Sequence, residues 1–163
     1  MLGLYIGSGI IGVAAILMLL SILLTRRDIK HAIMWHEGMS PGFRQFWGTY
    51  RIRMYPRWIW WWFRDVKVFH EVYIDSRLYS ETRGMNVAFG VIAWGKRIVV
   101  RHYSTNFEGA LLDYSTCWWP WSIIRDYVKR IKRTNAHKYI GKFCVKIPWI
   151  GELQLAWFTM EKI

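Results

Sequence analysis

The chain has 163 residues, of which 53% are hydrophobic and 18% aromatic, and its formal net charge is +12. Its 12 Trp residues exclude intrinsic disorder for the bulk of the chain, because disordered chains lack aromatic and β-branched residues. Its 13 Gly, 4 Pro and 2 Cys exclude collagen-like, low-complexity and disulfide-rich proteins, and the length allows one domain beyond any membrane segment.

The first charged side chain is Arg26, and an apolar run fills positions 2–24 before it. About 20 apolar residues are enough for a helix to cross the ~30 Å hydrocarbon core of a bilayer. A signal peptide would carry its basic residues before the apolar run, whereas here Arg26, Arg27 and Lys30 follow it. The sequence therefore predicts a transmembrane anchor over residues 1–25, the alternative being a buried helix of a soluble core.

The positions of the charges also predict an orientation. Because the basic residues follow the apolar run, the positive-inside rule places the rest of the chain in the cytoplasm or the organelle matrix. We therefore expect an integral, single-pass protein of a bacterial or mitochondrial inner membrane. Small residues in the first half of the run have the spacing that lets another helix approach closely. The predicted helix-packing positions are Gly3, Gly7, Ser8 and Gly12.

Residues 26–64 form a basic, Trp-rich segment with eight Lys or Arg and two acids, a net charge of +6. Apolar residues at 43, 46, 47, 50 and 54 follow helical spacing, which predicts a short juxtamembrane amphipathic helix that Pro56 ends. The alternative is a core helix packed on the following domain. The residues predicted to contact the membrane interface or a partner are Arg26, Arg27, Lys30, Arg51, Arg53, Arg57, Trp58, Trp60, Trp61, Trp62 and Arg64.

Residues 65–163 are expected to form a small α+β domain. Strand formers predict a strand over 66–74 and a hairpin of 86–94 and 97–103 around Gly95 and Lys96. Two more strands are predicted over 139–147 and 152–160. The fold class expected is therefore α+β, with the transmembrane helix, the amphipathic segment, one basic helix and an antiparallel sheet of about four or five strands.

The basic helix is predicted over residues 121–133, within a block (120–146) that carries eight Lys or Arg and one acid, a net charge of +7. Such a local positive field indicates contact with lipid headgroups, an acidic partner or RNA, unless the cations only form the solvated face of a packed helix. The predicted anionic-contact residues are Arg125, Lys129, Arg130, Lys132 and Arg133.

Nothing in the sequence indicates catalysis. Phosphate-binding glycine loops, nucleophile motifs and metal-ligand spacings are all lacking, so we expect neither an enzyme nor a cofactor. Cys117 and Cys144 lack C-x-x-C spacing and are expected to be small packing residues, although an oxidising compartment would allow a disulfide.

These patterns favour an accessory or structural subunit of a larger membrane protein complex, with membrane lipid and other membrane-protein subunits as partners. The first alternative is a membrane-tethered protein that binds nucleic acid, an acidic protein or anionic lipid through residues 120–146. The second alternative is a small phage or plasmid membrane effector. Nucleic acid is the less favoured partner, because the apolar run already holds the chain at a membrane surface.

Overall fold

A computed structural model describes residues 2–39, 41, 47–56, 65–74, 79–88, 92–103, 109–117, 120–132 and 137–163. The helices are α1 (Leu2–Arg27) and α2 (Ile29–His36), and a short 3-10 turn, η3 (Trp121–Ile123), precedes the sixth strand. The strands are β1 (Gly48–Tyr55), β2 (Asp65–Ile74), β3 (Tyr79–Ala88), β4 (Ile92–Tyr103), β5 (Gly109–Asp113), β6 (Ile124–Arg130), β7 (Lys138–Ile147) and β8 (Gly151–Lys162).

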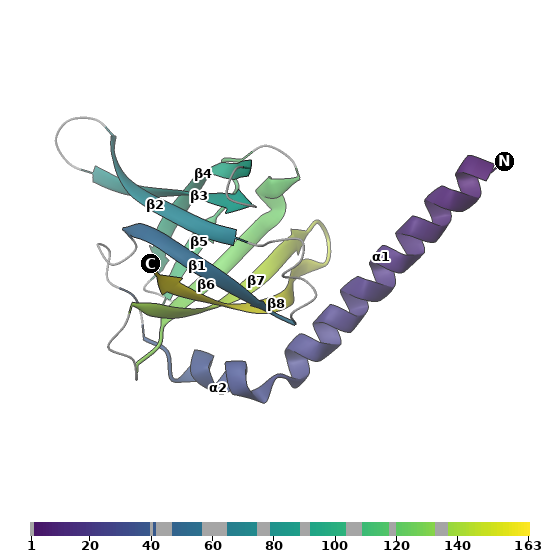
Figure 1. Cartoon of the computed structure of the whole chain (residues 1–163), viewed down its shortest axis with the longest axis horizontal. Helices are drawn as coiled ribbons and strands as arrows, with labels where there is room; N and C mark the ends of the chain where they lie inside the picture. The colour runs from purple at the N-terminus through teal and green to yellow at the C-terminus, as the bar shows by residue number, and fades with distance from the viewer. Residues whose placement is uncertain are drawn as a thin grey trace.

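The strands form one antiparallel sheet that closes on itself (Figure 1). Each strand pairs with the next along the chain, and β1 also pairs with β8, so that Tyr50 of β1 lies opposite both Lys67 of β2 and Lys162 of β8. Closure leaves no unpaired sheet edge among these strands. It also brings residues that lie far apart in the sequence to a shared interior.

Alternation along the strands separates the interior from the outer surface. In β1, Tyr50, Ile52 and Met54 are buried inside the barrel, while Arg51 and Arg53 are exposed. This period of two follows from the pleat, which points successive side chains to opposite faces. The largest fully buried side chains of the core are those of Tyr50, Tyr114, Tyr139 and Phe158.

Two glycines make room for aromatic rings inside the barrel. A Cβ atom on Gly141 of β7 would lie 2.2 Å from the ring of Phe158, which β8 places opposite it. A Cβ atom on Gly84 of β3 would lie 2.5 Å from the ring of Phe69 in the same way. The barrel core is therefore filled by rings that lie across neighbouring strands.

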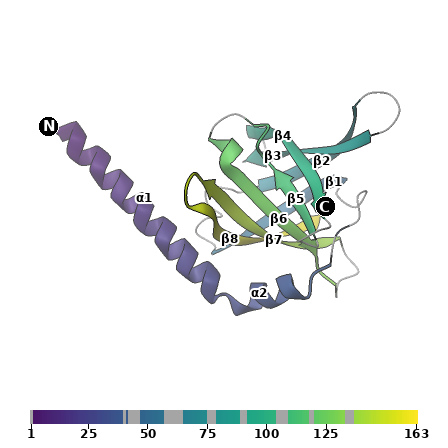
Figure 2. The ribbon, with the colours of Figure 1, turned by 180° about the vertical axis from the view of Figure 1, so that it is seen from behind.

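The helices lie outside the barrel. Figures 1 and 2 show α1 projecting away from the strands and α2 running along the outside of the barrel. Among the described residues, the last turns of α1 contact β8 through Ser21 and Thr25, and α2 packs on β7. Trp35 of α2 forms a second, smaller apolar cluster with Ile140 and Trp157 on the outer surface of the sheet.

The prediction of a transmembrane anchor, and with it of an integral single-pass location, is wrong for this structure. Within the part of the chain that the structure describes, neither α1 nor α2 is long and apolar enough to cross a membrane. Ser21 belongs to the predicted apolar span, yet Ser21 and Thr25 are buried and donate hydrogen bonds to the barrel. The last turns of α1 are thus part of the packing against β8.

The α+β prediction is also wrong, because two predicted helices are strands. Residues 48–55, expected in an amphipathic helix, form β1, and residues 124–130, expected in the basic helix, form β6. The hairpin turn predicted at Gly95 and Lys96 is wrong as well, since both lie within β4. The strands predicted at 66–74, 139–147 and 152–160 are confirmed as β2, β7 and β8.

Candidate functional site

A buried polar cluster lies inside the barrel. It consists of Lys67 of β2, Asn86 of β3, Tyr114 just after β5 and Asp126 of β6, whose side chains all face the interior. Lys67 Nζ donates to Asp126 Oδ2 at 2.8 Å and also to the Tyr114 hydroxyl. The Tyr114 hydroxyl donates to Asp126 Oδ2 at 2.8 Å, and Asn86 Nδ2 lies 3.4 Å from that hydroxyl. A buried charge pair of this kind is retained only when such hydrogen bonds compensate for lost solvation.

The electrostatics of the cluster keep the tyrosine protonated. Burial raises the pKa of Tyr114 well above its usual value, and the negative charge of Asp126 raises it further. The hydroxyl therefore remains a donor to the carboxylate. Oδ1 of Asp126 is buried and accepts no hydrogen bond from any residue within the described ranges. The ammonium group of Lys67 and the carboxylate of Asp126 neutralise each other within the cluster. Their ion pair therefore links β2 to β6.

A group of aromatic rings fills the interior beside the polar cluster. The Tyr50 and Tyr139 rings meet edge to face with their centroids 5.6 Å apart, and Phe69 lies 5.8 Å from Tyr50. Burial, together with Tyr139, raises the pKa of Tyr50, and burial raises that of Tyr139. Both phenols are therefore neutral and act in packing.

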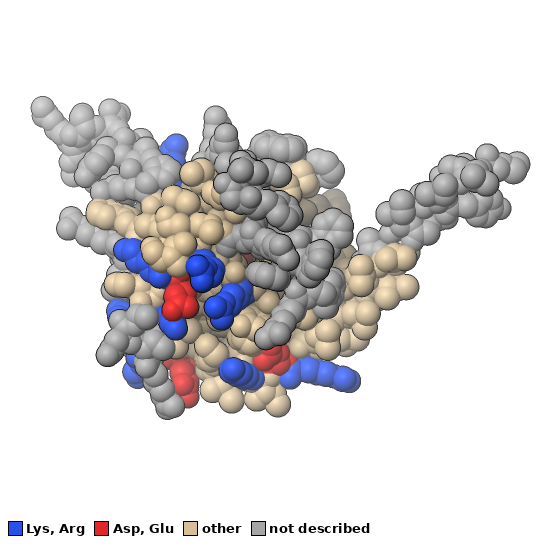
Figure 3. All heavy atoms as spheres, in the orientation of Figure 1, with Lys and Arg blue, Asp and Glu red and all other residues tan. Residues whose placement is uncertain are grey.

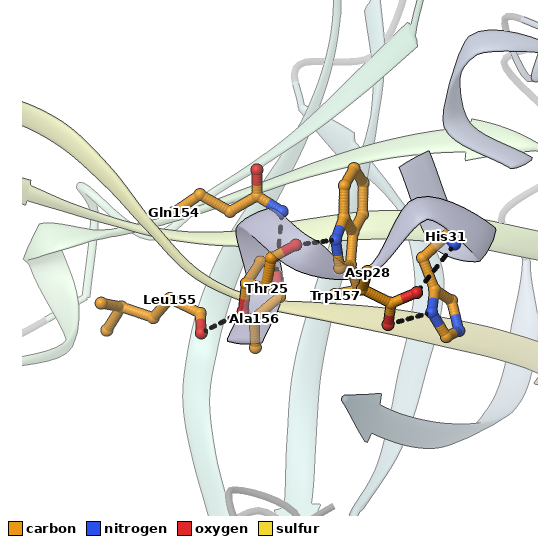
Figure 4. Close-up of polar contacts among 7 residues, drawn as sticks. All are labelled: Thr25, Asp28, His31, Gln154, Leu155, Ala156 and Trp157. Atoms are coloured by element: carbon orange, nitrogen blue, oxygen red, sulfur yellow. Dashed lines mark hydrogen bonds and ion pairs between the residues drawn. The ribbon is translucent and has the colours of Figure 1, made fainter. Parts of the chain in front are cut away.

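A third group of contacts fixes the base of α1 to the barrel (Figure 4). Thr25 Oγ1 donates to the carbonyl oxygen of Leu155 at 2.9 Å, and Ser21 Oγ donates to the same oxygen. In return, Trp157 Nε1 donates to the carbonyl oxygen of Thr25 at 3.0 Å. These bonds join the last turns of α1 to β8, so the direction in which α1 leaves the barrel is defined.

The joint between the two helices is also fixed. Asp28 caps α2, because Oδ1 accepts from the backbone N–H of His31 at 3.1 Å and Oδ2 accepts from His31 Nδ1 at 2.5 Å (Figure 4). The His31 ring in turn lies 4.1 Å from the Tyr55 ring of β1, measured between centroids. The cap and the ring contact together hold the start of α2 against the barrel.

Trp35 attaches the middle of α2. Its ring is contacted by two ammonium groups, with Lys142 Nζ 4.6 Å and Lys129 Nζ 5.2 Å from the ring centroid, and the Trp157 ring is 6.1 Å away. Cation–π contacts of this geometry are favourable, most of all when the cation is desolvated. Burial lowers the pKa of Lys142, and the nearby Lys129 lowers it further. Lys129, one of the predicted anionic-contact residues, and Lys142, which lies in the same 120–146 block, therefore both contact α2.

The other predicted anionic-contact residues have separate surroundings. Arg125 donates to the carbonyl oxygens of Ser122 and Ile124 at 2.8 Å and 2.6 Å, and it lies 3.4 Å from Asp113. Arg130 lies at the end of β6, where its backbone pairs with Met39. Lys132 is exposed, and Arg133 lies outside the described residues. Because residues 124–130 form a strand, they do not place these cations on the helix that the sequence predicted.

The remaining predicted residues are spread over the helices and β1. Gly3, Gly7 and Ser8 lie in α1, and a Cβ atom added to Gly12 would meet nothing within 4 Å. Arg26 and Arg27 are exposed at the end of α1, Lys30 is exposed in α2, and Arg51 and Arg53 are exposed on β1. Six residues predicted to contact the membrane interface or a partner lie outside the described part of the chain. They are Arg57, Trp58, Trp60, Trp61, Trp62 and Arg64.

Sequence reasoning missed the interior cluster. Lys67 lies within a run of strand formers, and Asp126 lies within a run of cations. The sequence pattern alone therefore predicts that both side chains are solvated. The detectable signal was the alternation of β6, in which Asp126 lies between the buried Ile124 and Val128. A single acid between two apolar residues at spacing two points to a buried charge that needs a partner.

Both cysteines are buried and neither forms a disulfide. Cys144 lies in β7, where burial raises the pKa of its thiol to about 12, with a further contribution from Asp126. A thiol in such a site is a poor nucleophile, because the thiolate is the reactive form.

Comparison of the chain with protein-family models, curated proteins and solved structures finds no match.

Proposed function

We propose that this protein is a non-enzymatic subunit of a larger protein assembly, and that α1 is the arm by which it binds an apolar helical segment of another subunit. The observation that supports this proposal is the exposure of apolar side chains along α1. Relative exposures are 58% for Val13, 59% for Ile16, 61% for Leu19 and 53% for Leu23.

These exposed side chains surround the helix. Each residue of an α-helix turns by about 100°, so the five consecutive exposed residues 16–20 occupy all of its sides. A helix that is apolar on all sides is normally covered by other structure. Covering a single Leu or Ile side chain contributes about 1.5–3 kcal/mol, which makes the arm a strong driving force for association.

The arm is also prepared for binding. Its base is held by Ser21, Thr25 and Trp157, so little orientational freedom remains to be lost when a partner binds. At Gly12 the surroundings are open, which allows a partner helix to approach the backbone. An apolar helical segment is the occupant that both features fit.

The test purifies the protein from its own cells under mild conditions. It compares the native mass, and the proteins that copurify, between the wild type and an arm variant. In the arm variant, Leu19→Gln and Leu23→Gln, we expect the large assembly of the wild type to dissociate. The matched control, Met39→Gln with Ile163→Gln, replaces apolar residues that are 43% and 59% exposed outside α1 and should leave the assembly intact.

Three results would contradict the proposal. One is a wild-type protein that runs as a single chain and stays soluble. Another is an assembly that survives in the arm variant. The third is association of the purified chain with protein-free lipid vesicles in place of any protein partner.

A further inference from the structure

The outer surface of β1, β8 and β7 carries a group of charges that the sequence did not bring together. This group, here called the β1–β8 patch, consists of Arg51 and Arg53 of β1, Glu161 of β8 and Lys138 of β7. Arg51 and Lys138 both lie opposite Glu161 in the strand register, one on each side of it. Figure 3 shows basic side chains gathered around an acidic one over β1 and β8.

The patch has an excess of positive charge. Lys138 Nζ lies 2.9 Å from Glu161 Oε1 and satisfies that carboxylate. The hydrogen bond from Lys138 lowers the pKa of Glu161, and the charges of Lys138, Arg53 and Arg51 lower it further. Neither Arg51 nor Arg53 forms an ion pair with any other residue of the described ranges. Two exposed guanidinium groups are therefore available to a partner.

The spacing of the two arginines indicates the shape of that partner. They are two residues apart on one strand and face the same side, which separates their Cα atoms by about 6.5 Å. Acidic residues at alternate positions of an extended segment have the same spacing. Because guanidinium groups bind carboxylates through paired hydrogen bonds, each arginine can bind one acid of such a segment.

From this arrangement we infer that the β1–β8 patch binds an extended acidic segment of a partner protein, with Arg51 and Arg53 each pairing with one of two alternate carboxylates. The inference rests on the proposed function and adds the chemistry of a second contact. Nucleic acid is the competing occupant, and it is disfavoured because base stacking needs aromatic side chains, which these four residues do not include.

The inference is tested by binding of an alternating Glu-Thr peptide to the full-length protein at low ionic strength, with oligouridylate of equal formal charge as the second probe. Charge reversal by Arg51→Glu with Arg53→Glu should weaken peptide binding about tenfold. The matched control, Lys132→Glu with Lys146→Glu, reverses two exposed cations outside the patch and changes the net charge by the same amount. The control should bind the peptide nearly as well as the wild type.

Any of the following results would overturn the inference. Equal weakening in both variants would show that net charge alone governs binding, and an undiminished affinity in the patch variant would place the contact elsewhere. Selective loss of oligouridylate binding in the patch variant would assign the patch to nucleic acid. The arm variant, Leu19→Gln with Leu23→Gln, should bind the peptide normally, so failure of this inference is distinguishable from failure of the proposed function.

Discussion

Gly141 is a position at which one added methyl group should disturb the packing of the barrel core. Its Cα faces the Phe158 ring, and a Cβ atom would lie 2.2 Å from that ring. We expect Gly141→Ala to lower the free energy of unfolding by about 1–3 kcal/mol, because Phe158 is fully buried and cannot move without strain. Urea denaturation measures this loss.

Gly12→Ala provides the matched control for that substitution. Nothing lies within 4 Å of a Cβ atom at Gly12, and alanine favours helix more than glycine does. The control should leave the urea midpoint unchanged or raise it slightly. An equal loss of stability in both variants would contradict the packing argument.

The pair of Lys67 and Asp126 is expected to show strong coupling. Lys67→Met leaves the Asp126 carboxylate buried without its ammonium partner, which should lower the free energy of unfolding by about 3–5 kcal/mol. The double variant, Lys67→Met with Asp126→Leu, removes both charges and should lose less stability than Lys67→Met alone. Urea denaturation of the single and double variants gives the coupling energy, and simple additivity would show that the two groups act independently.

The Cys144 thiol is expected to resist alkylation. A free thiol with the ordinary pKa of 9.0 is half ionised at pH 9, whereas the folded protein raises the pKa of Cys144 to about 12. Iodoacetamide at pH 9 should therefore modify Cys144 slowly in the folded protein and rapidly in urea, as mass spectrometry can measure. Rapid modification in the folded state would contradict its burial.

The same shift makes stability depend on pH. Between pH 9 and 12 the thiol ionises in the unfolded chain while it stays neutral in the folded one. Ionisation therefore favours unfolding, and the contribution of Cys144 to stability falls as the pH rises through this range.

At the scale of elements, the sequence predicts β2, β7 and β8 well and β1 and β6 poorly. Pro148 and Gly151 mark the turn between β7 and β8, and the flanking runs contain strand formers. In β1, Tyr50 and Met54 satisfy both a helical and a strand period, so the pattern allows either structure. In β6, the inward position of Asp126 interrupts the apolar alternation. The alternation of β6 is therefore complete only when Asp126 is counted as an inward-facing residue.

Trp35 is expected to control whether α2 stays on the barrel. Trp35→Ala removes the ring that contacts Lys129, Lys142 and Trp157, and it should lower the free energy of local opening of α2 by about 3 kcal/mol. Hydrogen exchange of the amides of residues 29–36 should accelerate accordingly. His36→Ala, at an exposed position of the same helix, should leave exchange nearly unchanged. Protected amides in the Trp35→Ala variant would show that the helix is held elsewhere.

At the scale of the whole molecule, closure of the sheet determines what the sequence could not predict. Lys67 and Asp126 are 59 residues apart in the sequence, and β1 and β8 are the first and last strands of the chain's strand order. Local sequence patterns predict neither the contact of Lys67 with Asp126 nor the pairing of β1 with β8. Both contacts depend on closure of the sheet, in which the first and last strands pair. The interior cluster and the β1–β8 patch are both products of that closure.

The barrel and the arm are expected to be separable, because the described bonds between α1 and β8 begin at Ser21. Deletion of residues 2–19 should therefore leave the barrel amides as protected from hydrogen exchange as in the full chain, while the proposed assembly should be lost. Deletion of β8 should instead unfold the chain, since β8 pairs with both β1 and β7 and provides Phe158 to the core. Barrel protection that disappears with the arm would show that α1 helps to hold the strands together, and persistent protection without β8 would contradict closure of the sheet.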